Sequence, residues 1–158
     1  MTNHAEKAKQ IIADNIYMTI ATASKSGKPW ISPVFFSYDQ DYNLYWVSSK
    51  NSLHSKLIRS NQQVAIVIFD SKAPEGAGDG VYFKARAMEL SDKTQISIAM
   101  EILGQRVTKD EFKIKELSEV SGNGIWRIYK ATPYEISKLT EGETINGQYV
   151  DKRIEVKL

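Results

Sequence analysis

Short runs rich in β-branched and aromatic residues recur along this chain, and turn residues separate them. The runs are 17–24, 30–38, 44–48, 64–69, 81–91, 125–131, 133–139 and 147–157. Alternation of apolar and polar residues, as in VYFKARAMELS (81–91), predicts half-buried β-strands. Turn sequences such as KSGKP and DQDYN join neighbouring runs and favour hairpin order. We therefore expect a mainly β fold, a small antiparallel β-barrel with helical insertions.

Helical spacing marks four segments between the strands. They are 3–14, 52–60, 92–105 and a short segment that begins at Thr108. Asn3 with Glu6, and Asp92 with Gln95, have the spacing of helix-capping pairs. The run VAIVIF (64–69) is apolar on both faces, which predicts a central strand.

Pro33 lies inside the expected strand 30–38 and has no amide hydrogen to donate. It should therefore lie at a sheet edge, at a bulge, or where the hydrogen-bonded ladder opens. An opened ladder would leave backbone groups free to bind a flat heterocycle, whereas an edge strand would only be protected by the proline.

Composition excludes several classes of function. The chain has 158 residues, enough for a single domain spanning 1–158, with 21 basic and 19 acidic residues. This balance argues against a nucleic-acid or membrane-surface partner. No cysteine is present and the two histidines are far apart in sequence, so no metal site is expected. A polar N-terminus and short apolar runs predict a soluble, cytoplasmic protein.

The stretch YWVSSKNSLHSKLIRSN (45–61) gathers hydroxyls and positive charge where a strand gives way to a helix. Ser48 and Ser49 end the strand, and Ser52 is a good N-cap. The first turn of a helix leaves amides unpaired, and such termini attract phosphate. Three cationic or ionisable side chains can reach an anion there: Lys50, His54 and Lys56. The alternative interpretation is an ordinary capped surface helix.

Catalytic side-chain sets are not evident. His54 has no acidic orienter nearby, and no paired carboxylates have a catalytic spacing. If the protein is an enzyme, a cofactor therefore supplies the reactive group. Trp126 and Arg127 lie side by side on a late strand and could face either a neighbouring subunit or a ligand.

The order of MTIATAS, KPWISPVFFSYD, NLYWVSSKNS and NQQVAIVIFD resembles the pyridoxamine 5′-phosphate oxidase-like family, the split barrels that bind flavin mononucleotide (FMN). The resemblance is best over 15–90. It implies a homodimer with FMN at the subunit interface. By position, Pro33, Val34 and Phe35 would line the flavin ring. The ribityl chain and phosphate would contact Val47, Ser48, Ser49 and Ser52.

The sequence departs from the family pattern Ser-Arg-Lys at Ser52, Leu53 and His54, so Lys50 or Lys56 would supply the missing charge. The late elements that hold vitamin B6 substrates are also not recognisable. We therefore expect an FMN-dependent oxidoreductase of an unidentified small molecule, with Trp126 and Arg127 of the partner on the substrate side. The alternatives are a deazaflavin (F420) reductase and a non-enzymatic flavin-binding or sensor protein.

Overall fold

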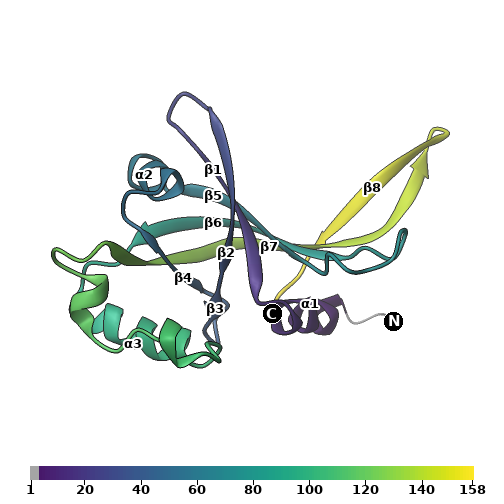
Figure 1. The fold of residues 1–158 in the computed structure, drawn as a ribbon. Helices are drawn as coiled ribbons and strands as arrows, with labels where there is room; N and C mark the ends of the chain where they lie inside the picture. Colours follow the sequence, from purple (N-terminus) through teal and green to yellow (C-terminus); the bar gives the residue numbers. More distant parts are fainter. Residues whose placement is uncertain (1–3) are drawn as a thin grey trace.

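The computed structural model describes residues 4–158 (Figure 1). Its helices are α1 (His4–Asp14), α2 (Leu53–Ser60) and α3 (Lys93–Gly104), with short 3₁₀ turns η1 (Asp110–Phe112) and η2 (Leu117–Val120). Its strands are β1 (Tyr17–Ala23), β2 (Pro29–Phe35), β3 (Ser37–Tyr38), β4 (Leu44–Ser49), β5 (Gln63–Phe69), β6 (Gly80–Glu89), β7 (Trp126–Ile145) and β8 (Gln148–Glu155). The expected cap at Asn3 lies outside the described residues.

All strand pairs are antiparallel, in the order β2-β1-β5-β6-β7-β4-β3, and β8 pairs with β7. The strands β2 and β3 lie at opposite ends of this order, yet only Phe36 separates them in the chain. The sheet must therefore curl until its two ends meet. This closure confirms the expected antiparallel barrel and leaves a seam where β2 faces β4 without a shared ladder.

Pro33 pairs with Thr19 of β1 and has no partner strand on its other side, because β2 is an edge of the sheet. Of the three positions that the sequence allowed for Pro33, the structure selects the edge. The strand β5 lies between β1 and β6, as its apolar character predicted.

The expected break between strands 125–131 and 133–139 is wrong, because β7 is one strand of 20 residues. Ala85 of β6 pairs with Pro133 and Lys84 pairs with Glu135, so Tyr134 is an extra residue at a bulge. A bulge accommodates a residue that lacks an amide hydrogen, and the strand continues past it.

Beyond the body of the sheet, β7 and β8 form a two-stranded arm that projects from the molecule (Figure 1). Its tip turns at Asn146 and Gly147, both at positive φ, which is typical of tight hairpins. Ile145 and Tyr149 are exposed on this arm.

Two further expectations are corrected. The run 30–38 is divided at Phe36, whose buried side chain packs in the core and marks the change from β2 to β3. The helix expected from Thr108 is only the 3₁₀ turn η1. None of its residues is buried, so no packing stabilises a longer helix there.

The core has two parts. The larger fills the barrel and includes Trp46, which stacks on Tyr129 with ring centroids 5.5 Å apart. Both ends of the described chain meet in this core, since Val156 joins the cluster that contains Ala8 and Ile12. A smaller cluster packs α3 against the outer face of β4. No helix in the described range 4–158 is long and apolar enough to cross a membrane.

Candidate functional site

Helix α2 begins at the end of β4, beside the seam of the barrel. Ser52 is its N-cap, and the Ser52 side chain accepts a hydrogen bond from the amide of Ser55. Ile58 is buried and anchors the helix. The amides of Leu53 and His54 lie in the first turn of α2. The residues four positions earlier are outside the helix, so these amides have no helical hydrogen-bond acceptor. The helix therefore presents donors at the mouth of the barrel.

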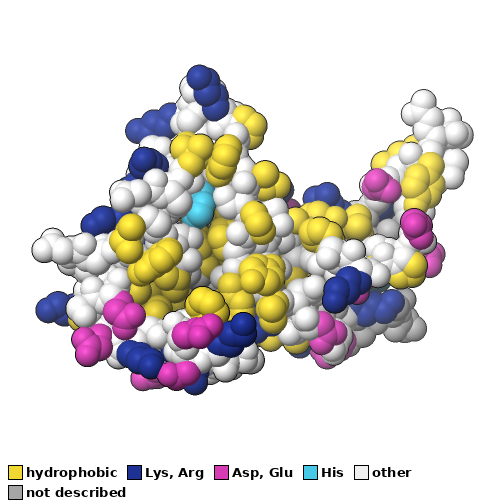
Figure 2. Space-filling model, viewed as in Figure 1, with side chains coloured by type: hydrophobic (Ala, Val, Ile, Leu, Met, Phe, Trp, Pro, Cys, Tyr) yellow, Lys and Arg dark blue, Asp and Glu magenta, His cyan; other side chains and the backbone are white. Residues whose placement is uncertain are grey.

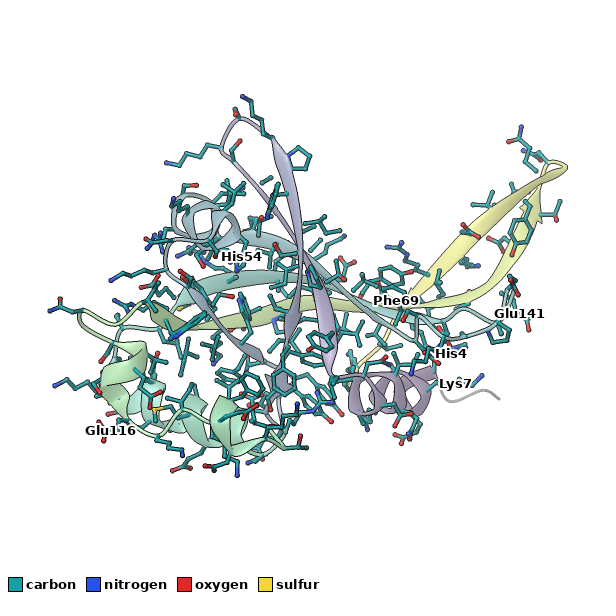
Figure 3. The ribbon with its side chains drawn as sticks, viewed as in Figure 1. His4, Lys7, His54, Phe69, Glu116 and Glu141 are labelled. Atoms are coloured by element: carbon teal, nitrogen blue, oxygen red, sulfur yellow. The ribbon has the colours of Figure 1, made fainter. Side chains whose placement is uncertain are left out.

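His54 lies across the seam, between α2 and the strands (Figure 3). Its Nδ1 is 3.1 Å from Oγ of Ser32 in β2, and its Nε2 is 2.8 Å from Oγ of Ser48 in β4. Nε2 is also 3.1 Å from Oγ of Ser52. The imidazole therefore links β2, β4 and the N-cap of α2 where the ladder is open.

The hydroxyls of Ser32, Ser48 and Ser52, which we call the hydroxyl cluster, surround the ring nitrogens of His54. No carboxylate contacts these nitrogens within residues 4–158. Because a hydroxyl can donate or accept, the serines satisfy the imidazole in either tautomer. Burial alone acts on the charge, and it lowers the pKa of His54 below the ordinary value of 6.5.

The free energy of unfolding is expected to fall as the pH is lowered through the range just below 6.5. The unfolded chain binds a proton on His54 near that value, whereas the folded chain binds it only at lower pH. Between the two values the unfolded state binds more protons, so stability rises with pH and is complete above the unfolded pKa. Urea unfolding at a series of pH values, for the wild type and for His54→Gln, measures the effect. A slope equal in both proteins would contradict it.

Of the other residues expected near a phosphate, Ser49 and Lys50 belong to the tight turn into α2. The amide of Asn51 donates to Oγ of Ser49, and the amide of Lys50 donates to the carbonyl of Ile125. Lys56 is exposed on α2, while His54 and Ser55 are buried. Lys56 therefore lies outside the hydroxyl cluster, although it remains a cation on the same helix.

The residues expected to line a flat ring divide between the two faces of β2. Val34 is buried in the barrel core, so only its backbone faces outward. Pro33 is exposed and Phe35 half-buried on the outer face. Phe35 and Val47 both line a cavity of about 440 Å³ between β2, β4 and α3. Figure 2 shows hydrophobic side chains gathered on this face around His54.

Trp126 and Arg127 have different surroundings. Trp126 is half exposed at the start of β7. Arg127 is buried, and its guanidinium donates to the carbonyls of Gly122, Gly124 and Trp126 at 2.6 to 2.8 Å. Its Nε also lies 3.3 Å from Glu89. These contacts favour a structural role for Arg127, and they leave Trp126 as the residue available to a ligand or a second subunit.

Sequence reasoning missed one member of the cluster, Ser32. Ser32 faces inward from β2, and the indole nitrogen of Trp30 donates to its hydroxyl at 3.1 Å. The signal was the alternation along β2, since Ser32 shares the inward face with Val34. The contact between Ser32 and His54 could not be inferred, because it depends on closure of the barrel.

A curled antiparallel sheet with a hydroxyl-lined helix N-terminus and an apolar cavity at its seam defines a split barrel. The model of the pyridoxamine 5′-phosphate oxidase family matches residues 5–128. The chain belongs to this family. Comparison with curated proteins gave no match.

Several solved structures share the fold. The heme storage protein HutZ from Vibrio cholerae has a TM-score of 0.69 and 16% identity, over 84% of this chain and 92% of its own. A FAD-binding protein from Mesorhizobium loti has a TM-score of 0.61 and 20% identity, over 85% and 92%. A pyridoxamine 5′-phosphate oxidase-related, FMN-binding protein from Nostoc punctiforme has a TM-score of 0.63 and 11% identity, over 98% of both chains.

Proposed function

We propose that this protein is a homodimeric flavoprotein that binds FMN and catalyses oxidation or reduction of a small molecule. One observation carries the proposal: a hydroxyl cluster and a helix N-terminus lie at the seam between β2 and β4, and Phe35 and Val47 of the same two strands line an apolar cavity. The family and its FMN-binding structural neighbour support the same cofactor.

The chemistry of the hydroxyl cluster fits a phosphate. Ser48, Ser49 and Ser52 supply hydroxyls, and the first turn of α2 supplies amides and the positive end of a helix dipole. No carboxylate contacts the cluster within the described chain. His54 would hold the hydroxyls in place, and Lys50 and Lys56 would supply the positive charge that the family places on an arginine and a lysine.

The outer face of β2 fits a flat ring. Pro33 and Phe35 of β2 and Val47 of β4, which we call the ring strip, present apolar side chains beside the seam, and the edge of β2 leaves backbone groups unpaired. Bound flavin would supply hydride acceptance and donation at N5. The chain itself would orient the substrate and exclude water from the cavity.

The cleft would be completed by a second copy of the chain. Tyr17 and Ile31 are exposed apolar side chains on the β1–β2 edge of the sheet, on the outer face that also carries Pro33 and Phe35. An exposed apolar face of this kind is typical of a subunit interface. Trp126 of the partner is then a candidate for the substrate side.

Ile31→Lys is expected to convert a dimer into a monomer and to lower flavin affinity with it. Burial of an isoleucine contributes about 1.5–3 kcal/mol, and a symmetric interface loses two such side chains. The dissociation constant of the dimer should therefore rise at least about 100-fold. Light scattering on the purified proteins measures the mass. Ile98→Lys on α3 is the control, because Ile98 is 52% exposed and Ile31 is 64% exposed. A monomeric wild type would contradict the shared cleft.

The function is tested by the visible absorbance spectrum of the fresh protein and by chromatography of the extracted chromophore. Release of FMN supports the proposal, whereas release of a deazaflavin favours an F420-type reductase. A colourless protein that does not bind added FMN would overturn it. Turnover with a reduced nicotinamide and an electron acceptor distinguishes an enzyme from a flavin-binding sensor. Haem ligation is less well supported, because serine hydroxyls occupy both ring nitrogens of His54.

A further inference from the structure

The cavity beside the ring strip has an apolar wall. It lies between β2, β4, the C-terminal end of α3 and the segment 104–114. Its hydrophobic lining residues are Ile16, Tyr17, Phe35, Val47, Met100, Leu103, Val107, Phe112 and Ile114. A volume of about 440 Å³ is within the range of small-molecule sites. The cavity is therefore large enough for a compound of about two rings.

The charged residues that line this cavity are all basic. They are Arg106, Lys109 and Lys113, and no aspartate or glutamate is among the lining residues. Lys109 lies over the exposed ring of Phe112, with Nζ 6.0 Å from the ring centroid. Lys113 has one weak contact, 3.8 Å from a carboxylate oxygen of Asp110. The rim therefore carries positive charge that the cavity does not balance.

Arg106 adds a partly buried charge with no acidic partner. Its guanidinium donates to the carbonyls of Ala13 and Asn15 at 2.9 and 2.8 Å, and it stacks over the rings of Phe36 and Tyr38. Within residues 4–158 it forms no ion pair. Burial lowers the pKa of Arg106, because removal from water disfavours the charged form. An anion in the cavity would stabilise it.

We propose that this cavity binds an aromatic organic acid, with the ring system against Met100, Leu103 and Ile114 and the acidic group toward Lys109 and Lys113. Arg106 also lines the cavity, and its guanidinium, bonded to the carbonyls of Ala13 and Asn15, adds positive charge there. The site exists in the chain alone. That its ligand is the substrate rests on the proposed flavin function, because Phe35 and Val47 are shared with the ring strip.

The test uses two dyes with one ring system. 8-Anilinonaphthalene-1-sulfonate carries an acidic group, and N-phenyl-1-naphthylamine lacks it. Fluorescence titration of the full chain is expected to give one saturable site per chain and at least about tenfold tighter binding of the sulfonate. Higher salt should weaken the sulfonate more than the neutral dye, because the lysines are at the surface. Equal affinities, or no saturable site, would overturn the proposal.

Two variants locate the site. Lys109→Gln combined with Lys113→Gln should weaken the sulfonate about tenfold and leave the neutral dye within about twofold. Gly104→Leu should weaken both dyes, because Gly104 lines the cavity and a Cβ there meets no atom within 4 Å. Gly78→Leu is the matched control, since Gly78 is equally open in the loop between β5 and β6. Binding unchanged by Gly104→Leu would place the dyes elsewhere and overturn the proposal.

Flavin content, measured by absorbance on the same samples, separates the two proposals. Lysine-dependent dye binding in a protein that takes up no flavin supports the acid site and contradicts the flavin function. Flavin uptake without a preference for the sulfonate dye supports the flavin function and contradicts the acid site.

Discussion

Replacing Ser48 and Ser52 together by alanine is expected to lower the affinity for FMN by a factor of about 100 or more. Each hydroxyl that bonds a charged phosphate contributes about 1.5–3 kcal/mol, and about 1.4 kcal/mol corresponds to a tenfold change in affinity. Both hydroxyls also contact Nε2 of His54, so their loss removes the support of the imidazole as well. Fluorescence quenching of FMN during titration measures the dissociation constant.

Ser52 is also a helix cap, so its loss has a structural effect of about 1 kcal/mol that must be separated from binding. Ser52→Asp keeps a capping side chain but places a carboxylate beside the phosphate, and it should impair binding without unfolding the helix. Ser60→Ala, at the other end of α2, is the control, because Ser60 donates to the carbonyl of Leu57 in its own helix and is far from the N-cap. An unchanged dissociation constant in the double variant would remove the phosphate assignment.

Arg127→Ala is expected to lower the free energy of unfolding by about 3 kcal/mol. The buried guanidinium joins three carbonyls of the segment 122–126 to Glu89, and each hydrogen bond lost with it contributes about 0.5–1.5 kcal/mol. Glu89 keeps Arg59 and the hydroxyl of Tyr129, which limits the loss. Chemical denaturation of the two proteins measures the difference.

Arg127→Lys should recover little of this stability, because an ammonium cannot reproduce the planar fork. Arg86→Ala provides the control, since Arg86 is an exposed arginine on β6 whose Nε bonds Gln62. The opposite result, full stability of Arg127→Ala with loss of turnover, would assign Arg127 to the substrate instead of to the loop.

The antiparallel barrel could be predicted from the sequence because its strands are local patterns, but its pairings at a distance could not. Pro33 illustrates the limit: its missing donor allowed an edge, a bulge or an opening, and only the strand order distinguishes them. The runs 125–131 and 133–139 were expected to be separate strands, yet a bulge at Tyr134 lets β7 continue past Pro133. A local pattern cannot show which partner strand will adjust.

The site was predictable to the same extent. Ser48, Ser52 and His54 lie within seven residues, so their proximity follows from the local strand-to-helix turn. Ser32 is 22 residues away from His54 and joins only because the curled sheet brings β2 against β4. The same dependence on closure explains why the cavity between β2, β4 and α3 had no signature in the sequence.

The meeting of both chain ends in one core bears on how the protein is made. Ala8 and Ile12 leave the ribosome before the strands do, but they cannot complete their packing until Val156 has emerged and its amide has bonded to the carbonyl of Ile136. Until then the apolar face of α1 and the inner face of the sheet are only partly buried. Newly made chains would therefore expose these surfaces until β8 has been synthesised, a period in which chaperones bind apolar segments and aggregation competes with folding.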